Sequence, residues 1–386
     1  MKKLLLLVLI AAVLYLTLAP TKVEPVAWTA PPAPSTKEGS YAVNDKLKGV
    51  QRIAQIDAVG PESVVIDSAG VVYTGYVDGR VVRFAPDGGN GEVLANTGGR
   101  PLGVALAPGG GLFVADANRG LLQIDDKGGV KLLAEESDGL RFGFTDDLST
   151  DSAGEHVYFS DASSKFGFGH HMEDIIEHGA NGRLLRYDIA TGKTTTLLNG
   201  LHFANGVAVG PNDEFVLVNE TSEYRVMRYW LKGDKAGTAE PFIENLPGFP
   251  DNITFNGKDR FWLALAAPRD DLLDQMADKP FVRKMVARLP AAIQPKPKRH
   301  ALALALDLNG KVVANLQDAS EGAFSPVTSV REFGPWIYFG SLSETSLARL
   351  PLNQAFPDSP PAPAGWEKVP GPYELNTPPP VNRVGT

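Results

Sequence analysis

Two apolar strands joined by a short turn form a pattern that occurs six times along this 386-residue chain. The first strands of the six copies are predicted at residues 61–66, 101–106, 145–150, 204–209, 250–255 and 327–332. A supersecondary unit that recurs at a regular period indicates a repeat architecture, in which each unit buries its apolar faces against its neighbours.

The second residue of each copy sets the spacing of the repeat. These residues are Glu62, Leu102, Asp146, Asn205, Asp251 and Thr328, at intervals of 40, 44, 59, 46 and 77 residues. Four-stranded propeller blades are about 40–50 residues long, so the two long intervals must contain insertions. We predict an all-β, six-bladed β-propeller over residues 46–356, whose last blade is completed by the strand at 49–57. A β-sandwich is the alternative, and six copies in one register disfavour it.

The two insertions are expected at residues 165–180 and 270–300, and part of the second, residues 272–289, is predicted as a short helix. The first contains His170, His171 and His178, which we expect in a solvated loop that caps the channel; metal binding by the three is the alternative. His202 lies beside Asn205 and is expected either to line the pocket or to pack in the core.

The N-terminus carries a targeting signal. Lys2 and Lys3 precede an apolar run at residues 4–18, so residues 1–19 are predicted to be a signal-anchor or a signal peptide. No A-x-A cleavage site is evident, which favours a membrane-anchored protein with the lysines cytoplasmic and the propeller exported. A cleaved signal and a secreted soluble protein is the alternative.

Two proline-rich segments flank the predicted propeller. Residues 20–45 are expected to form a stalk between membrane and propeller, and residues 357–386 an irregular tail.

Composition excludes several classes of function. The net charge of −8 argues against a nucleic-acid-binding surface. The chain has no cysteine, which excludes disulfides, thiolate metal sites and a cysteine nucleophile. A G-x-S-x-G elbow, a phosphate-binding loop and a dinucleotide fingerprint are also absent from the sequence.

The innermost strand of each blade lines the central channel of a propeller, so the six second positions are expected around one axis. Four of the six carry carboxylate or amide oxygens: Glu62, Asp146, Asn205 and Asp251. Three carboxylates in a dry channel raise one another's pKa unless a cation neutralises them. Calcium takes six to eight oxygen ligands and fits this set better than magnesium or zinc. The alternative is that Asp and Asn merely cap turns at the strand starts.

Several motifs carry a family resemblance. They lie at residues 144–148, 158–166, 200–208, 228–238 and 245–253. Through them the chain resembles the strictosidine synthase-like branch of the calcium-dependent phosphotriesterase superfamily, which also contains paraoxonases and gluconolactonases. Within that branch it is most similar to the adipocyte plasma membrane-associated type, which has an N-terminal membrane anchor. The resemblance extends over roughly residues 50–352.

The resemblance implies a set of calcium ligands. In the hydrolytic relatives the ion is held by a Glu, two Asn and an Asp, which correspond here to Glu62, Asp146, Asn205 and Asp251. Asp146 stands where the relatives usually have Asn, which adds a charge and keeps an oxygen. Asn252 matches a further ligand of paraoxonases. Asp251 also occupies the position proposed as nucleophile or general base in some relatives.

Two departures narrow the expected chemistry. Thr328 stands where strictosidine synthases have their catalytic glutamate, and Leu102 where paraoxonases have a histidine. The expected function is therefore a calcium-dependent hydrolase of a small lactone or ester, similar to gluconolactonases or arylesterases, with Asp251 as the catalytic residue. The alternative is a non-catalytic, membrane-tethered binding protein that keeps its metal for structure.

Overall fold

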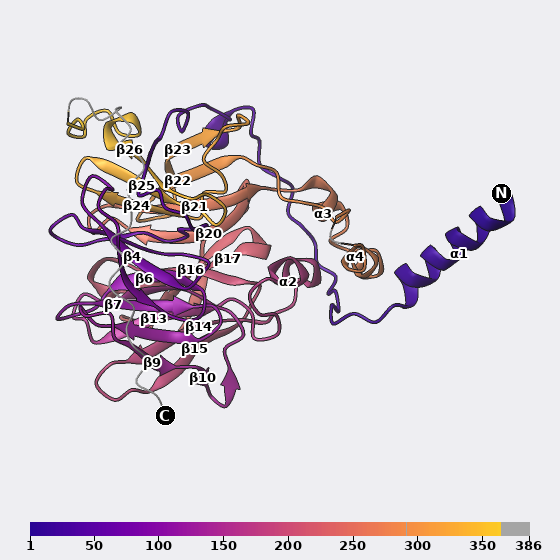
Figure 1. Ribbon diagram of the computed structural model, residues 1–386, viewed down its shortest axis with the longest axis horizontal. Coiled ribbons are helices and arrows are strands. Elements are labelled where there is room, and N and C mark those ends of the chain that lie inside the picture. Colours follow the sequence, from indigo (N-terminus) through magenta and orange to yellow (C-terminus); the bar gives the residue numbers. More distant parts are fainter. Residues whose placement is uncertain (291, 364–386) are drawn as a thin grey trace.

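The computed structural model describes residues 1–290 and 292–363. It confirms the six-bladed β-propeller: six four-stranded antiparallel sheets form the body of the molecule (Figure 1). The predicted tail at 357–386 lies largely outside the described residues.

The first five blades are each built from four consecutive strands. Blade one contains β2 (Val65–Ile66), β3 (Val72–Gly75), β4 (Arg80–Phe84) and β5 (Glu92–Asn96). Blade two contains β6 (Pro101–Leu106), β7 (Leu112–Asp116), β8 (Gly120–Ile124) and β9 (Val130–Ala134). Blade three contains β12 (Thr145–Thr150), β13 (His156–Asp161), β14 (Gly182–Asp188) and β15 (Thr194–Leu201). A small ribbon, β10 (Glu136–Ser137) with β11 (Leu140–Arg141), precedes blade three.

Blade four contains β16 (Ala204–Val209), β17 (Phe215–Glu220), β18 (Arg225–Trp230) and β19 (Ala239–Ile243). Blade five contains β20 (Gly248–Phe255), β21 (Arg260–Pro268), β22 (Ala301–Asp307) and β23 (Val312–Asp318). In each of these five blades the first strand of a sequence repeat lies at one edge of the sheet and the strands follow in chain order, as the short connections between them favour.

The ring closes through a strand from the other end of the propeller sequence. Blade six contains β24 (Ser329–Phe333), β25 (Trp336–Gly340), β26 (Leu347–Pro351) and β1 (Gln51–Ile53). β1 pairs antiparallel with β26, and the Arg349 guanidinium donates to Gln51 Oε1 at 2.7 Å. Joining the two ends of the sequence in one sheet removes an open sheet edge, as predicted for the strand at 49–57.

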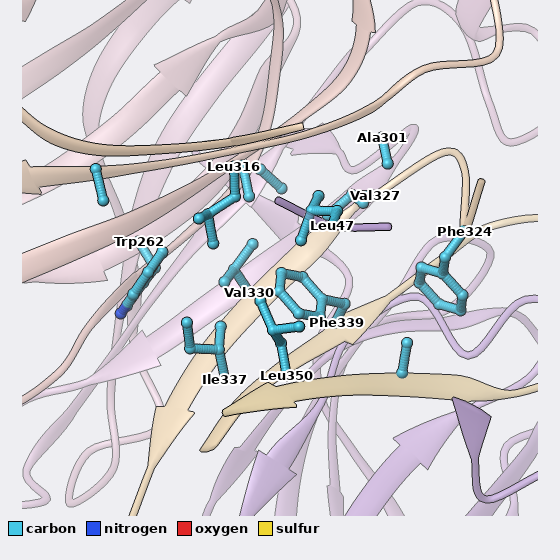
Figure 2. Packing of buried hydrophobic residues seen from close by; sticks show 14 of the residues in the cluster. Leu47, Trp262, Ala301, Leu316, Phe324, Val327, Val330, Ile337, Phe339 and Leu350 are labelled. Atoms are coloured by element: carbon cyan, nitrogen blue, oxygen red, sulfur yellow. The ribbon is translucent and has the colours of Figure 1, made fainter. Parts of the chain in front are cut away.

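Apolar side chains from neighbouring blades pack against one another between the sheets. Figure 2 shows one such layer, in which Trp262 and Leu316 of blade five face Val330, Ile337 and Phe339 of blade six. All five are buried. Because each sheet contributes one face to each of two such layers, both faces of a blade are apolar.

The four α-helices of the described residues lie outside the blades, all toward the same side of the molecule (Figure 1). They are α1 (Lys2–Leu18), α2 (His171–Glu177), α3 (Asp271–Gln275) and α4 (Pro280–Ala287). α3 begins where the Asp270 carboxylate accepts the backbone N–H groups of Leu272 and Leu273. The predicted helix at 272–289 is thus two helices, and the first insertion forms a helix where a loop was expected.

The N-terminal helix projects from the propeller and buries none of its residues (Figure 1). Within the described part of the chain, no helix has the length and apolar character needed to cross a membrane.

The proline-rich segment after α1 lies against the helices of the two insertions. The backbone N–H of Val26 donates to the carbonyl of Glu177 in α2, and that of Trp28 donates to the carbonyl of Ala277 beyond α3. The buried Arg283 of α4 donates to the Val26 carbonyl at 2.7 Å. This segment therefore ties the two insertions together.

Candidate metal centre and cavity

Register shifts in the innermost strands set the direction of the ring side chains. The pairing of β12 and of β16 with the next strand shifts at one place and that of β20 at two, and Asp146, Asn205 and Asp251 lie at these shifts. A bulge turns a side chain away from the regular alternation of the strand. The repeated shift therefore explains why one register of the repeat supplies the polar ring.

Close approach of the inner strands depends on a glycine beside the ring. A Cβ atom at Gly206 would lie 2.5 Å from the backbone oxygen of Asp251 and from the nitrogen of Ile253. On the other side, the backbone N–H of Val207 donates to the Asp147 carboxylate at 2.9 Å. Blades three, four and five are thus fixed to one another at the level of the ring.

The structure brings four of the five predicted ligands to one cavity of about 370 Å³. Glu62, Asp146, Asn205 and Asp251 line it, and each side chain is at least nine-tenths buried. Asn252 lies behind this surface, where its amide nitrogen donates to Glu62 Oε1 at 2.5 Å.

Burial and mutual repulsion dominate the electrostatics of the ring. Burial, followed by the charges of Asp251 and Asp146, raises the pKa of Glu62 well above its ordinary value. Burial and the neighbouring carboxylates raise the pKa of Asp146 and of Asp251 in the same way. Burial also raises the pKa of Asp147 to about 7. A cation among these groups would reverse the effect, because an opposite charge favours the ionised carboxylates.

Within the described part of the chain, three buried oxygen atoms at or behind the ring have no hydrogen-bond partner: Glu62 Oε2, Asn205 Oδ1 and Asn252 Oδ1. Buried acceptors without a partner are costly, and a metal ion in the cavity would supply one to the two that belong to lining residues, Glu62 and Asn205. The donor set contains only carboxylate and amide oxygens, which calcium prefers. The residues present therefore fit a calcium ion.

The ring carboxylates are not crowded together. Among the described residues, the one set of three acidic or histidine side chains whose ligand atoms all lie within 4.8 Å is His178, His202 and Glu223. An ion at the ring would thus draw on the amide oxygens and on water as well as on carboxylates, in keeping with calcium's high coordination number.

Arg100 is a site residue that the sequence did not reveal. Its buried guanidinium lines the cavity and donates to the Gly60 carbonyl at 2.9 Å. Burial lowers the pKa of Arg100, and the charges of Glu62 and Asp146 oppose that shift. The side chain is thus a cation beside the ring carboxylates. The only sequence signal for Arg100 was its position one residue before the second repeat. The ring position of that repeat is apolar, so nothing there pointed to a polar site.

Apolar side chains form most of the cavity wall. Four phenylalanines line it, Phe144, Phe168, Phe203 and Phe249, together with Leu102 from the ring position of blade two. Helices α2 and α3 add residues such as Met172, Ile175 and Leu273, and Lys296 and Lys298 come from the second insertion. The cavity is therefore polar at the ring and largely apolar elsewhere, an arrangement typical of small-molecule sites.

Thr328 and the histidines of the first insertion occupy different places around the cavity. Thr328 lies behind the ring and donates its hydroxyl hydrogen to the Glu62 carbonyl at 2.9 Å. His171 lines the cavity and His170 is exposed. The expected solvated loop is wrong for His178, which is 2% exposed because it packs between Trp28 and His202.

His202 was expected either to line the pocket or to pack in the core, and the structure places it in neither position. It is partly exposed and stacks on His178, with ring centroids 4.4 Å apart. Its position in the chain next to Asn205 does not bring it into the cavity wall.

Comparison with known proteins matches two family models. The strictosidine synthase model matches residues 146–234, and the strictosidine synthase-like N-terminal model matches residues 39–84. The adipocyte plasma membrane-associated protein of Rattus norvegicus is 34% identical over 338 residues, covering 82% of this chain and 89% of that protein. The strictosidine synthase-like 4 protein of Arabidopsis thaliana is 35% identical, covering 80% of this chain and 84% of its own length.

Solved structures with the same fold are more distant in sequence. A gluconolactonase from Xanthomonas campestris has a TM-score of 0.56 at 16% identity, covering 86% of this chain and 99% of its own. A calcium-binding regucalcin from Agrobacterium tumefaciens has a TM-score of 0.55 at 16% identity, covering 78% of this chain and 92% of its own. At this level of identity the match supports the fold.

Proposed function

Since the chain belongs to the family of strictosidine synthase-like and adipocyte plasma membrane-associated proteins, we propose that it is a calcium-dependent hydrolase of a small lactone or ester. The observation that carries the proposal is the buried ring of carboxylate and amide oxygens at one end of a largely apolar cavity, two of which, on Glu62 and Asn205, have no hydrogen-bond partner among the described residues. The gluconolactonase and calcium-binding relatives of the same fold support it.

In this proposal the ring holds the metal. Glu62, Asp146, Asn205 and Asp251 are the ligands, with Asn252 supporting Glu62 through its amide. When bound, calcium would polarise the substrate carbonyl and keep the surrounding carboxylates ionised.

Asp251 is the proposed catalytic base. It faces the cavity, where its ionised carboxylate would take a proton from the water that attacks the carbonyl carbon. The departing alcohol takes that proton when the ester C–O bond breaks. The Asn205 amide is hydrogen bonded to the Asp251 side chain, and the backbone carbonyl of Asp251 accepts from the buried Asn219 amide, so the base is held in place from two sides.

The cavity wall favours an apolar substrate. Phenylalanine rings and the side chains of α2 and α3 would cover the body of an aryl or alkyl ester, whereas a polyhydroxylated sugar lactone would leave most of its hydroxyl groups without partners there. We therefore place aryl esters and apolar lactones ahead of sugar lactones.

We also propose that the protein is attached to a membrane through its N-terminus, with the propeller exported. The apolar α1 follows Lys2 and Lys3, and several relatives are named as plasma membrane-associated. Arg288, next to α4, donates to the carbonyls of Leu16 and Ala19, so the end of α1 lies beside the insertions that form the cavity wall.

The test is hydrolysis of phenyl acetate, an apolar δ-lactone and gluconolactone by the purified protein, with millimolar calcium and with excess EDTA. We expect the aryl ester and the apolar lactone to be hydrolysed faster than gluconolactone, and all activity to disappear with EDTA and return with calcium. Absence of hydrolysis across all three substrates in calcium would contradict the proposal and favour a binding protein.

A further inference from the structure

We propose that His178, His202 and Glu223 form a second metal site, separate from the calcium ring, that takes a transition-metal dication such as Zn²⁺. The three side chains bring one ligand atom each within 4.8 Å of the others. Two imidazoles and one carboxylate are a ligand set that suits zinc and related metals, whereas the ring offers only oxygens. The inference does not depend on the proposed hydrolysis.

The distances between the ligand atoms are close to those around a tetrahedral zinc ion. Nε2 of His178 lies 2.9 Å from Glu223 Oε1, and Nε2 of His202 lies 3.8 Å from the same oxygen. Ligands about 2.1 Å from a tetrahedral zinc ion are separated by about 3.4 Å, and the two distances bracket that value. Changes of about half an ångström in these distances, with rotation of the two imidazoles, whose rings now stack 24° from parallel, would thus admit an ion.

A backbone hydrogen bond prepares His202 for coordination. Nδ1 of His202 is 3.2 Å from the carbonyl oxygen of His178, so Nδ1 donates to it and carries the proton. The lone pair of His202 is then on Nε2, the atom nearest to Glu223. Metal-binding histidines commonly donate their other ring nitrogen to a carbonyl or carboxylate in this way, which fixes the tautomer.

The charge states also favour a metal. Burial lowers the pKa of His178, so its imidazole is neutral at neutral pH. Although burial alone would raise the pKa of Glu223, its hydrogen bond with His178 and nearby positive charge hold that pKa below its ordinary value. Binding then requires the His178 proton to move from Nε2 to Nδ1, and a metal–carboxylate bond replaces the hydrogen bond to Glu223.

The site would join three separate parts of the chain. His178 follows the last residue of α2, His202 lies between β15 and β16, and Glu223 belongs to the short 3₁₀ helix Thr221–Glu223 that follows β17. The side chains of His202 and Glu223 are about one-fifth exposed, which leaves room for a water ligand. A bound ion would therefore fasten the helix of the first insertion to blade four, at the wall of the cavity.

Trp28 provides a direct optical probe. Its ring stacks on His178, with centroids 4.0 Å apart and planes 8° from parallel. A Co²⁺ ion on His178 Nε2 would lie close enough to quench the fluorescence of Trp28. The experiment is a Co²⁺ titration of the calcium-loaded full-length protein, followed by competition with Zn²⁺ and by calorimetric titration with Zn²⁺.

We expect saturable quenching at one Co²⁺ per chain, reversed by Zn²⁺. Quenching and calorimetric Zn²⁺ binding should weaken at least tenfold in His202→Ala and in Glu223→Gln. Trp28→Phe should lose most of the quenching and keep Zn²⁺ binding. His170→Ala is the matched control, because His170 forms an exposed pair with Glu173 at 2.9 Å and should leave both signals unchanged.

Circular dichroism establishes that each variant is folded, and the isosteric Glu223→Gln guards against a packing defect in His202→Ala. Two results would overturn the proposal. One is the absence of saturable Co²⁺ or Zn²⁺ binding below about 100 μM. The other is binding that survives both His202→Ala and Glu223→Gln but is lost in Glu62→Gln, which would assign the ion to the calcium ring.

Discussion

The ring of the cavity and the wall of the cavity come from different kinds of sequence. The ring residues occupy one register of a six-fold repeat, and three of them, Asp146, Asn205 and Asp251, lie at register shifts of the innermost strands. The wall comes largely from two insertions between repeats, whose helices are held by the N-terminal segment. The strand ladders fix the ring, whereas the wall depends on contacts between segments far apart in the sequence.

This difference separates chemistry from substrate binding. Changes at the ring should alter metal binding and catalysis with little effect on how substrate is held. Changes in the wall and its supports should alter substrate affinity and leave the metal in place. Substitutions at the ring and in the wall should therefore have distinguishable effects.

The largest effect is expected at Asp251. Asp251→Asn keeps the size of the side chain and one oxygen but removes the charge that accepts a proton. We expect hydrolysis to fall about 10²-fold or more, on the scale of losing a general base. The measurement is kcat/KM for the best ester at saturating calcium, with Thr328→Ala as control, which should lose less than about threefold.

Full activity of Asp251→Asn with normal metal content would contradict the catalytic role. Activity that returns when calcium is raised would instead make Asp251 a ligand alone.

The next effect concerns Glu62. Glu62→Gln removes one carboxylate from the ring and also changes the acceptor of the Asn252 amide. We expect calcium to bind about tenfold more weakly, since ligand charge sets calcium affinity. Calorimetric titration of the metal-free protein measures it, and KM at saturating calcium should stay within about twofold. A calcium affinity equal to that of the wild type would remove Glu62 from the ligand set.

The wall should respond in the opposite way. The Arg283 guanidinium, 1% exposed, joins α4 to the Val26 carbonyl of the N-terminal segment. Arg283→Met keeps much of the apolar volume and removes the hydrogen bonds, so we expect KM to rise several-fold. Calcium affinity should be unchanged. A variant with normal KM and weakened calcium binding would show that ring and wall are not separable.

A smaller effect is expected from pH in the metal-free protein. The pKa of Asp147 is about 7 in the folded state and near 3.9 in an unfolded chain, so the folded protein retains a proton that the unfolded chain releases. The contribution of Asp147 to the free energy of unfolding is therefore most favourable below about pH 4 and becomes less favourable as the pH rises toward 7. Glu62, Asp146 and Asp251 shift in the same direction.

With EDTA, we expect the melting temperature to fall by on the order of 3 °C between pH 5 and pH 8. Saturating calcium should abolish or reverse that fall, because the ion favours the ionised carboxylates. A melting temperature that rises over this pH interval without metal would contradict the electrostatics of the ring.

Much of the ring could be predicted from the sequence because the repeat imposes its register. The position of Asp251 in copy five is comparable with that of Asn205 in copy four, and the strand at 49–57 was expected to close the ring. The side chains outside that register could not be placed. Arg100 lies one residue before a repeat whose ring position is apolar, and nothing in its spacing indicates that its side chain reaches the cavity.

The packing of the cavity wall could not be predicted from the sequence either. Trp28 and His178 stack although 150 positions separate them in the chain, and no periodicity links the two segments. His178 was expected in a solvated loop because its neighbours His170 and His171 are polar and the segment is irregular. Its burial depends on the N-terminal segment, whose path along the insertions no local pattern indicates.

The most direct test of the account is thermal unfolding of the purified protein in excess EDTA and in millimolar calcium, beside Glu62→Gln under the same conditions. A ligand that binds only the folded state adds about 2.7 kcal/mol at a hundredfold excess over its dissociation constant. We therefore predict a melting temperature several degrees higher in calcium, with a smaller shift for Glu62→Gln at the same calcium concentration. Equal melting temperatures of the wild-type protein in EDTA and in calcium would contradict a calcium ion at the ring.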